Sequence, residues 1–552
     1  MASKRVLIVG GVAGGASCAA RLRRMDEHAE VFLFERSGAV SFANCGLPYY
    51  LGGVIPERKH LLVSTPERFR DFFNVEVRIW HNVRRIDRHN RTIEVENVQT
   101  GEVQSEAYDA LVLAPGAMPV RPPLAGIDLP GVFSLRTLSD VDAAEAWVAR
   151  HMPQRAVVVG AGYIGLEMVE NLARRDCQVT VLEAADQIMP PADPEMVKPI
   201  EEELCRQGVD LRLSDPVAGF ERGPDDTIIV TSKSGVQVTA ELVVLSIGVK
   251  PDVQLARDAG LAIGPTGGIQ VDDQMRTSDP NIFAVGDAAE VRNFVTGRPA
   301  LIPLAGPANR QGRIAADVIC GRDAHYRGTQ GTAVVGVFDL TLAMTGETEK
   351  SLRRAGIAFE KSYTHSFHHA SYYPGAERIA LKLLFAPDTG RILGAQAVGR
   401  KGVEKRIDVI AMALQMKATV FDLEEAELCY APQYGSAKDA VNMAGFVAAN
   451  IVRGDVLVAH WSDWKEQTAA GRAPLVLDVR PPTAVAAAAI PGTTRIPLSE
   501  LRVRLDELPR DREIWVHCAV GQTSYIATRL LSQHGFRVRN LSGGMTSYKL
   551  ER

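Results

Sequence analysis

The sequence predicts an α/β protein of several domains, and three observations carry that prediction. Apolar, strand-like runs that turn through glycines into helical segments begin near residues 5 and 155. A shorter series of strand-like and helical segments follows residue 460. The chain has 552 residues, of which 46% are hydrophobic, which is enough for three or four domains with ordinary cores.

The first glycine-rich turn predicts a dinucleotide site. It follows the apolar run 5–9, precedes a helical segment at 16–25, and has Val12 where a second glycine is usual. Glycines let the backbone approach a pyrophosphate, and the helix N-terminus supplies N–H donors and a positive dipole end. A strand at 30–35 ends in Glu35, an acid placed to bind a ribose. The residues predicted to contact this nucleotide are Gly10, Val12, Ala13, Gly14, Gly15, Glu35 and Arg36.

The second glycine-rich turn has all three glycines and predicts a second dinucleotide domain of the Rossmann type. Its following strand, 179–183, ends in Glu183, which would bind a 2′-hydroxyl and repel a 2′-phosphate. No arginine follows Glu183, so NADH is favoured over NADPH, although a neighbouring loop could still supply the charge. The predicted contacts are Gly160, Gly162, Tyr163, Ile164, Gly165, Glu183 and Gly248.

Three further segments indicate which nucleotide binds where. Residues 111–116, with Ala114 and Gly116, and residues 245–248 look like links between the two nucleotide domains. Residues 277–289 resemble the second FAD motif of the two-dinucleotide disulfide reductases. That resemblance implies that FAD uses the first fingerprint and NAD the second. It also implies that Gly286 and Asp287 contact the flavin, with Asp287 holding the ribityl chain.

Charge and composition argue against nucleic-acid and membrane partners. The formal net charge is -4, and lysines and arginines are dispersed rather than gathered in a basic stripe. No apolar run is long enough to span a bilayer, and the first residues lack the apolar stretch of a secretory signal. We therefore expect a cytoplasmic protein.

The cysteines suggest reactive thiols rather than a metal site. Seven cysteines are scattered without Cys-x-x-Cys pairing, so we predict no metal and a reducing compartment. Cys45 and Cys518 stand in distinctive local sequences. Four others are expected to be small core residues: Cys18, Cys177, Cys205 and Cys320.

Cys45 lies in the segment 41–49, Ser-Phe-Ala-Asn-Cys-Gly-Leu-Pro-Tyr, without the second cysteine of classical disulfide reductases. This segment resembles the single-cysteine coenzyme A disulfide reductases and the NADH oxidases and peroxidases. The oxidases and peroxidases typically carry a histidine in the first glycine loop, which is absent here, so a thiol substrate is favoured. A following helix N-terminus and a flavin are expected to lower the pKa of Cys45 and make it redox-active.

The same resemblance implies coenzyme A contacts. Ser41 and Asn44 are candidates for its thiol end. Arg21, Arg23 and Arg24 are candidates for its phosphates, although a solvated helix face explains these arginines equally well.

Residues 430–445 closely resemble the dimerisation segment of coenzyme A disulfide reductases, and Tyr372 lies in an earlier segment that fits the same family. The resemblance implies an α+β dimerisation domain and a homodimer in which Tyr430 and Tyr372 reach the partner's cysteine. A tyrosine hydroxyl there could protonate a departing sulfur. Ordinary aromatic packing at a dimer interface is the alternative.

The last part of the chain resembles a rhodanese domain. Its third strand, 513–518, ends in Cys518, which opens a loop into a helix, where backbone N–H groups can cradle a thiolate or persulfide. Asp478 and Arg480 are expected to support this loop. Thr523 replaces the arginine of many rhodaneses, and the usual Gly-His before Ile-Pro-Gly is absent, so a thiosulfate preference stays open.

Together these segments predict two Rossmann-type domains, an α+β dimerisation domain and a C-terminal α/β rhodanese domain. The predicted boundaries are 1–118 and 246–325 for the FAD-binding domain, 119–245 for the NAD-binding domain, 326–449 for the dimerisation domain, 450–459 for a linker and 460–552 for the rhodanese domain.

The resemblance implies an NADH-dependent flavoprotein that reduces coenzyme A persulfide, polysulfide or coenzyme A disulfide, with catalytic Cys45 and a sulfur-carrying Cys518. An NADH oxidase or peroxidase, a sulfurtransferase with a regulatory flavin, and a redox-sensing module are alternatives. The sequence leaves open the physiological sulfur donor and whether Cys518 feeds Cys45 directly or through coenzyme A.

Overall fold

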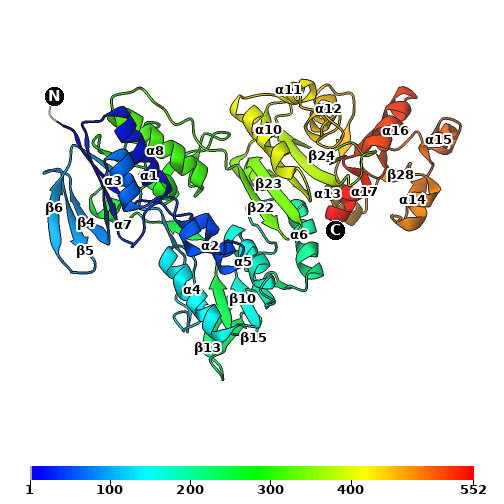
Figure 1. The fold of residues 1–552 in the computed structure, drawn as a ribbon. Coiled ribbons are helices and arrows are strands. Elements are labelled where there is room, and N and C mark those ends of the chain that lie inside the picture. Colours follow the sequence, from blue (N-terminus) through cyan, green and yellow to red (C-terminus); the bar gives the residue numbers. More distant parts are fainter. Residues whose placement is uncertain (1–2, 552) are drawn as a thin grey trace. The chain divides into compact units, whose positions relative to one another are not determined.

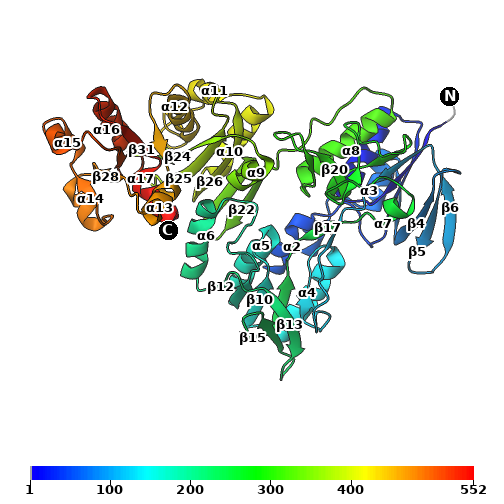
Figure 2. The same cartoon turned by 180° about the vertical axis from the view of Figure 1, so that it is seen from behind.

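The computed structural model describes residues 3–551 and divides into two compact units. The first comprises the residues up to 188 together with 208–329, and the second comprises 189–207 together with the residues from 330 onward. Figures 1 and 2 show the elements of each unit from opposite sides. Both fingerprints and Cys45 lie in the first unit, and Cys518 lies in the second.

One parallel sheet of the first unit carries the first fingerprint. Its strands follow the order β19-β7-β1-β2-β3, and helices α1 and α8 pack together beside it. The helices approach closely because a Cβ at Gly312 would lie 2.2 Å from the carbonyl oxygen of Gly14. The elements are β1 (Arg5–Val9), α1 (Ala13–Met25), β2 (Glu30–Glu35), α3 (Pro66–Phe73), β3 (Glu76–Ile79), β7 (Ala110–Leu113), α7 (Gln254–Asp258), β19 (Ile282–Ala284) and α8 (Ala305–Ile319).

A second parallel sheet carries the second fingerprint, with strand order β12-β11-β10-β16-β9. The strands β10 and β16 are buried along nearly their whole length, as expected for parallel strands covered on both faces. The elements are β9 (Val132–Phe133), α4 (Leu138–His151), β10 (Arg155–Val159), α5 (Tyr163–Ala173), β11 (Gln178–Leu182), β12 (Asp210–Arg212) and β16 (Leu242–Leu245).

Smaller sheets complete the first unit. The strands β8 and β17 pair antiparallel and join the two predicted links between the nucleotide domains. The remaining strands are β4 (His81–Asp87), β5 (Thr92–Asn97), β6 (Val103–Ala107), β8 (Ala117–Pro119), β13 (Val217–Arg222), β14 (Ile228–Ser232), β15 (Gln237–Ala240), β17 (Val249–Pro251), β18 (Ile269–Gln270), β20 (Ala289–Arg292) and β21 (Pro299–Ala300).

The second unit contains an antiparallel sheet with strand order β22-β23-β26-β25-β24. Helices α10 and α12 pack on this sheet, so it forms an α+β layer pair. The elements are α6 (Pro194–Arg206), β22 (Ala333–Val337), β23 (Leu340–Gly346), α9 (Glu349–Ala355), β24 (Glu360–Phe367), β25 (Arg378–Phe385), β26 (Ile392–Gly399), α10 (Val403–Gln415), α11 (Val420–Glu425) and α12 (Ala440–Val452).

Helix α6 belongs to the second unit, although its sequence falls inside the range suggested for the NAD-binding domain. It is anchored by Lys382, whose fully buried ammonium donates to Asp193 (2.9 Å), Glu195 (2.5 Å) and Glu349 (2.8 Å). A buried charge of this kind is tolerated only when it is paired. The cluster therefore fixes α6 against the antiparallel sheet.

The rhodanese-like part of the second unit has a parallel sheet with strand order β27-β31-β30-β28-β29. The predicted α/β fold class is confirmed by these four principal sheets. The elements of this part are β27 (Val458–Ala459), α13 (Trp461–Ala469), β28 (Leu475–Asp478), α14 (Pro482–Ala487), β29 (Thr494–Arg495), α15 (Leu498–Leu501), β30 (Ile514–His517), α16 (Gln522–Gln533), β31 (Val538–Leu541) and α17 (Gly544–Leu550).

Across residues 3–551, no helix combines the length and the apolar character needed to cross a membrane.

Candidate active site

Cys45 lies in a single 3-10 turn, Asn44–Gly46, that leads into the short helix α2 (Leu47–Leu51). The thiol is solvent-accessible, and its sulfur lies 3.7 Å from Asn44 Oδ1. A Cβ at Gly46 would lie 2.7 Å from Leu61, so glycine lets the turn pack closely on the next segment. Ser41 precedes the turn with a φ of 48°, a conformation rare outside glycine and common near functional sites. The motif therefore presents a thiol on a tightly held turn.

The surrounding protein raises the pKa of Cys45. Desolvation is the largest cause, and the negative charges of Glu167 and Asp287 add to it, while Arg136 lowers the pKa. The expected lowering by a helix N-terminus is therefore wrong for the protein chain by itself. The following helix is only five residues long, and burial, followed by the charges of Glu167 and Asp287, acts in the opposite direction.

Glu167 was not identified from the sequence. It lies on α5, directly after the second fingerprint, and accepts a hydrogen bond of 3.3 Å from the Tyr49 hydroxyl. Burial raises the pKa of Glu167 to about 7, so its carboxyl group can gain or lose a proton near neutral pH. Burial and Glu167 raise the pKa of Tyr49 to about 12. The available signal was an acidic side chain, Glu167, two residues after the second fingerprint on a largely apolar helix.

Arg136 was also missed, because it stands far from every motif in the sequence. Its guanidinium donates to Asp287 at 2.8 Å, and both side chains are largely buried. The adjacent Gly286 donates its N–H to Gln311 at 2.7 Å. The segment predicted to be the second FAD motif therefore lies within the electrostatic reach of Cys45.

The acids of the two fingerprints have matching environments. Glu35 accepts hydrogen bonds from the backbone N–H groups of Gly11 and Ser37, each at 2.9 Å. Glu183 accepts from Ala161 at 2.6 Å and from Ala185 at 2.8 Å. Both carboxylates are buried. Each acid thus holds its glycine turn in place and retains lone pairs for a ribose hydroxyl.

The glycines of the fingerprints fall into two groups. A Cβ at Gly10 would lie 2.1 Å from the Ala114 carbonyl oxygen, and one at Gly15 would lie 1.9 Å from that of Gly10, so these two serve close packing. At Gly162 and Gly248 a Cβ would meet no protein atom within 4 Å. Gly162 precedes the first residue of α5, so the open space there and the free N–H groups of the helix N-terminus fit a dinucleotide phosphate.

The other predicted nucleotide residues surround the same turns. Val12 immediately precedes α1, and Gly116 has a φ of 75°, a conformation that favours glycine. Arg36 is half-exposed and pairs with Asp252 at 2.9 Å. The residues that begin a helix after a fingerprint are Ala13, Gly14, Tyr163, Ile164 and Gly165.

The three candidate phosphate-binding arginines differ. Arg21 is mostly buried and pairs with Asp317 between α1 and α8, so its charge is already matched. Arg23 is buried and donates to five backbone carbonyl oxygens, so the expectation that it meets a coenzyme A phosphate is wrong. Arg24 is exposed.

In the second unit, Tyr372 and Tyr430 lie together. Their hydroxyl oxygens are 2.7 Å apart, and both residues are exposed, Tyr372 to 74% and Tyr430 to 48%. Arg406 fixes the segments that carry them, because it donates to the His368 carbonyl oxygen at 2.6 Å and to Asp439 at 2.6 Å and 3.1 Å.

Cys518 follows β30 and begins the loop that leads into α16. Its sulfur accepts hydrogen bonds from the Gly521 N–H at 3.2 Å and the Ser524 hydroxyl at 3.4 Å. Only 2% of the residue is exposed. The expected cradle thus consists of one backbone donor and one hydroxyl in the described part of the chain. Asp478 and Arg480 form a buried ion pair beside the preceding strand.

The other cysteines were largely assigned to the core. Cys18 and Cys177 are buried and Cys320 is partly buried, but Cys205 is exposed at the end of α6, so a core role is wrong for it.

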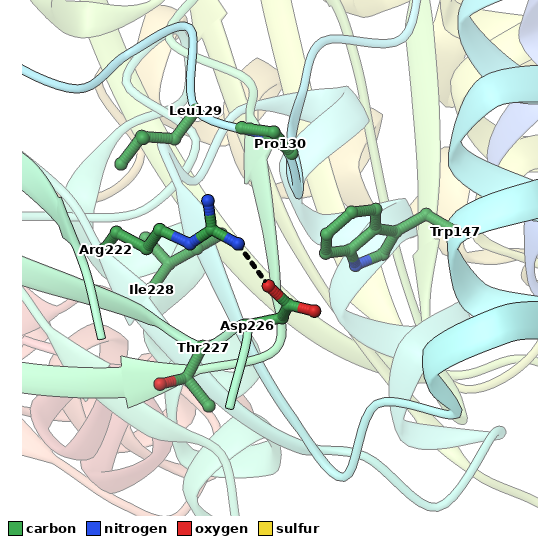
Figure 3. A pocket seen from close by; sticks show the side chains of 7 residues that line it. All are labelled: Leu129, Pro130, Trp147, Arg222, Asp226, Thr227 and Ile228. Atoms are coloured by element: carbon green, nitrogen blue, oxygen red, sulfur yellow. Dashed lines mark hydrogen bonds and ion pairs between the residues drawn. The ribbon is translucent and has the colours of Figure 1, made fainter. Parts of the chain in front are cut away.

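A small pocket in the first unit does not involve these residues. Arg222 pairs with Asp226 at 2.5 Å across it, and Trp147 closes one side (Figure 3). The lining residues are Leu129, Pro130, Trp147, Arg222, Asp226, Thr227 and Ile228.

Comparison with known families matches three successive parts of the chain. Residues 4–312 match the pyridine nucleotide-disulphide oxidoreductase family, residues 332–440 match the dimerisation domain of those oxidoreductases, and residues 462–551 match the rhodanese-like domain.

Individual proteins extend this likeness. A coenzyme A disulfide reductase of Staphylococcus haemolyticus is 35% identical over 81% of this chain and all of its own length. The reduced CoADR-RHD protein of Bacillus anthracis is 46% identical, with a TM-score of 0.97 over 100% of this chain and 98% of its own. The NAD-dependent persulfide reductase of A. fulgidus is 36% identical, with a TM-score of 0.90 over 99% of this chain and 100% of its own.

Proposed function

Because the chain belongs to the pyridine nucleotide-disulphide oxidoreductase family, we propose that it is an NADH-dependent flavoprotein reductase of sulfane sulfur. Its substrates are coenzyme A persulfide or polysulfide, with coenzyme A disulfide as a second substrate. The observation that carries this proposal is the union, in one chain, of a lone accessible Cys45 and a rhodanese-type Cys518. The likeness over nearly the full length to a persulfide reductase and to a CoADR-RHD protein supports it.

Family membership implies FAD and NAD(H). We propose that Glu35 and Asp287 hold FAD and that Glu183 selects NADH. The carboxylate of Glu183 accepts a ribose 2′-hydroxyl but repels a 2′-phosphate. The open space beside Gly162 supports a phosphate contact there.

In the first step, the Cys45 thiolate attacks the outer sulfur of coenzyme A persulfide. A Cys45 persulfide forms, the substrate S–S bond breaks, and coenzyme A leaves as a thiolate that takes up a proton. Two electrons then cleave the S–S bond of the Cys45 persulfide, Cys–S–SH, into thiolate and hydrosulfide. A bound flavin, reduced by NADH, supplies those two electrons. With coenzyme A disulfide the same steps give a mixed disulfide and two thiols.

Side chains near Cys45 can accept and donate the protons that this reaction needs. Because the protein raises the pKa of Cys45, its proton needs an acceptor, and Glu167, with a pKa of about 7, can hold a proton near neutral pH. We propose that Tyr430 and Tyr372 reach the cysteine of the other subunit in a homodimer and protonate the leaving coenzyme A. The match to a dimerisation domain supports that assembly.

Coenzyme A is proposed to bind at Ser41, Asn44 and Arg24, since Arg21 and Arg23 are engaged within the fold. Cys518 is proposed to hold sulfane sulfur as a persulfide. We also propose a cytoplasmic location for the protein, which fits the free cysteines of the chain.

The test is NADH oxidation without oxygen, with coenzyme A persulfide, polysulfide and coenzyme A disulfide supplied separately. We expect turnover with persulfide that is abolished in Cys45→Ser. Cys205→Ser, which alters another exposed cysteine, serves as the matched control and should keep full activity. Turnover in air only would establish an NADH oxidase instead, and persulfide transfer without NADH would establish a sulfurtransferase.

A further inference from the structure

The edge strand β24 of the antiparallel sheet contacts the rhodanese-like part of the second unit directly. The Tyr363 N–H donates to the Ser542 hydroxyl at 3.1 Å, and His365 Nε2 shares a hydrogen bond of 2.9 Å with the Ser547 hydroxyl. All four residues are at least 95% buried. Strand β24 and helix α17 lie side by side in both views (Figures 1 and 2).

Residues 542–547, which are bonded to β24, are also bonded to the Cys518 loop. The Met545 N–H donates to the Cys518 carbonyl oxygen at 2.8 Å, and the Thr546 N–H donates to the Ala519 carbonyl oxygen at 2.9 Å. The Trp461 indole secures the same turn by donating to the Gly544 carbonyl oxygen at 2.8 Å. The first two residues of the loop are thus bonded to the start of α17.

The turn Gly543–Gly544 is tightly packed against its neighbours. A Cβ at Gly543 would lie 1.9 Å from Ser547 Oγ and 2.9 Å from His365 Nε2. A Cβ at Gly544 would lie 2.5 Å from the Cys518 carbonyl oxygen. Both glycines have positive φ values, 69° and 58°, so the turn is specified by conformation as well as by space.

The loop in turn sets the hydrogen bonds to the sulfur. Gly521 donates its N–H to Cys518 Sγ, and the single hydroxyl proton of Ser524 is shared between that sulfur at 3.4 Å and the Gly521 carbonyl oxygen at 3.1 Å. The position of Gly521 therefore controls both donors to a thiolate or persulfide. Such donors stabilise sulfur-centred negative charge only when they are held in place.

His365 suits a permanent structural contact. Burial and Arg378 lower the pKa of His365 to about 3, so the ring is neutral near pH 7. In a neutral imidazole Nε2 is either a donor or an acceptor, and the Ser547 hydroxyl can pair with it in either state.

We propose that His365 and Ser547 are positioning residues for the sulfur chemistry of Cys518, which makes β24 a structural part of the rhodanese site. The dimerisation sheet thus contributes contacts that hold the Cys518 loop of the rhodanese domain in place. This inference rests on the proposed sulfur-carrying function of Cys518, but the reactivity of the thiol tests it separately.

The experiment uses the full-length holoenzyme and the variants Ser547→Ala and His365→Leu. The first readout is the rate of Cys518 alkylation by iodoacetamide, followed by mass spectrometry of the Cys518 peptide. The second readout is sulfur transfer with thiosulfate, and in parallel polysulfide, as donor and cyanide as acceptor. With thiosulfate, Cys518 gains one sulfur and releases sulfite, and cyanide then takes that sulfur as thiocyanate, so no net electron is required.

We expect both variants to raise Cys518 alkylation and lower sulfur transfer, each by about tenfold, the order that one lost buried hydrogen bond carries. His365→Gln, which retains a polar group, should recover part of the sulfur transfer. Lys549→Ala changes an exposed residue of the same helix and should match the wild type. Anaerobic reduction of coenzyme A disulfide should stay unchanged in all of them.

Unchanged alkylation and unchanged transfer in both variants would overturn the proposal. Should the wild type transfer no sulfur from either donor while Ser547→Ala still accelerates alkylation, the sulfur-carrying function would fail and the positioning role would stand. Where a variant does not fold, Ser542→Ala provides the same test with a smaller loss, because it removes only the contact to the Tyr363 N–H.

Discussion

Replacing Arg406 by methionine should destabilise the second unit strongly and impair the tyrosines that it supports. The Arg406 guanidinium is 2% exposed and donates to Asp439, to the His368 carbonyl oxygen and to the Gly402 carbonyl oxygen. Methionine has a similar length but leaves Asp439 buried without a counter-charge. Removing one partner of a buried ion pair costs about 3–5 kcal/mol.

The size of this loss can be compared with a nearby surface arginine. Arg400 is 36% exposed on its side chain and pairs with Glu203, Asp339 and Glu377 at 3.0–3.7 Å. Exposed pairs of this kind contribute about 0–1 kcal/mol. Arg400→Met is therefore the matched control for Arg406→Met.

The assay is calorimetric thermal unfolding of the full-length holoenzyme, combined with anaerobic turnover. For a unit of about 240 residues, a loss of 3–5 kcal/mol corresponds to a decrease of roughly 6–20 °C in the transition of the second unit. At temperatures below that transition, turnover should still fall, because the segments that carry Tyr372 and Tyr430 lose their common anchor. Equal melting temperatures for the Arg406→Met and Arg400→Met proteins would refute the reasoning.

Three other predictions concern proton chemistry and pH. Tyr430→Phe should lower anaerobic turnover by about 100-fold, which is in the range expected for loss of a general acid, and should leave reduction of the flavin by NADH unchanged. An unchanged rate of anaerobic turnover would identify a packing role. Glu167→Gln should shift the pH profile of Cys45 alkylation to lower pH, because the carboxylate raises the pKa of that thiol; a profile at higher or identical pH would contradict this. Acid should destabilise the second unit, because burial lowers the pKa of His365 and His460 to about 3, against an ordinary value of 6.5. Between these two pKa values the unfolded chain binds more protons than the folded chain, so the stability present above pH 6.5 is lost as the pH falls toward 3. The loss is up to about 1.4 kcal/mol per pH unit for each histidine. Thermal unfolding between pH 7.5 and 5 measures this loss, and a melting temperature of the second unit that is independent of pH would contradict the prediction.

Local sequence patterns were sufficient for most of the fold. Glycine turns between an apolar strand and a helix depend on neighbouring residues, so both nucleotide domains and the strand before Cys518 could be read directly. Cys45 could be singled out for the same reason, because its motif is continuous in sequence.

Contacts between distant segments could not be predicted in this way. Arg136 and Glu167 influence Cys45 from other elements, and no spacing in the sequence joins them to it. The same holds for Lys382, which attaches α6 to the second unit, and for the contact of His365 with Ser547. In the protein chain alone, burial and these distant charges raise the pKa of Cys45, whereas the predicted lowering counted on a helix N-terminus together with a flavin.

The account is tested most directly by the ratio of hydrogen sulfide released to NADH consumed, measured without oxygen and with coenzyme A persulfide as the only acceptor. It predicts one sulfide per NADH in the intact enzyme and none in Cys45→Ser. Sulfide release that does not consume NADH, or NADH consumption that needs oxygen, would contradict it.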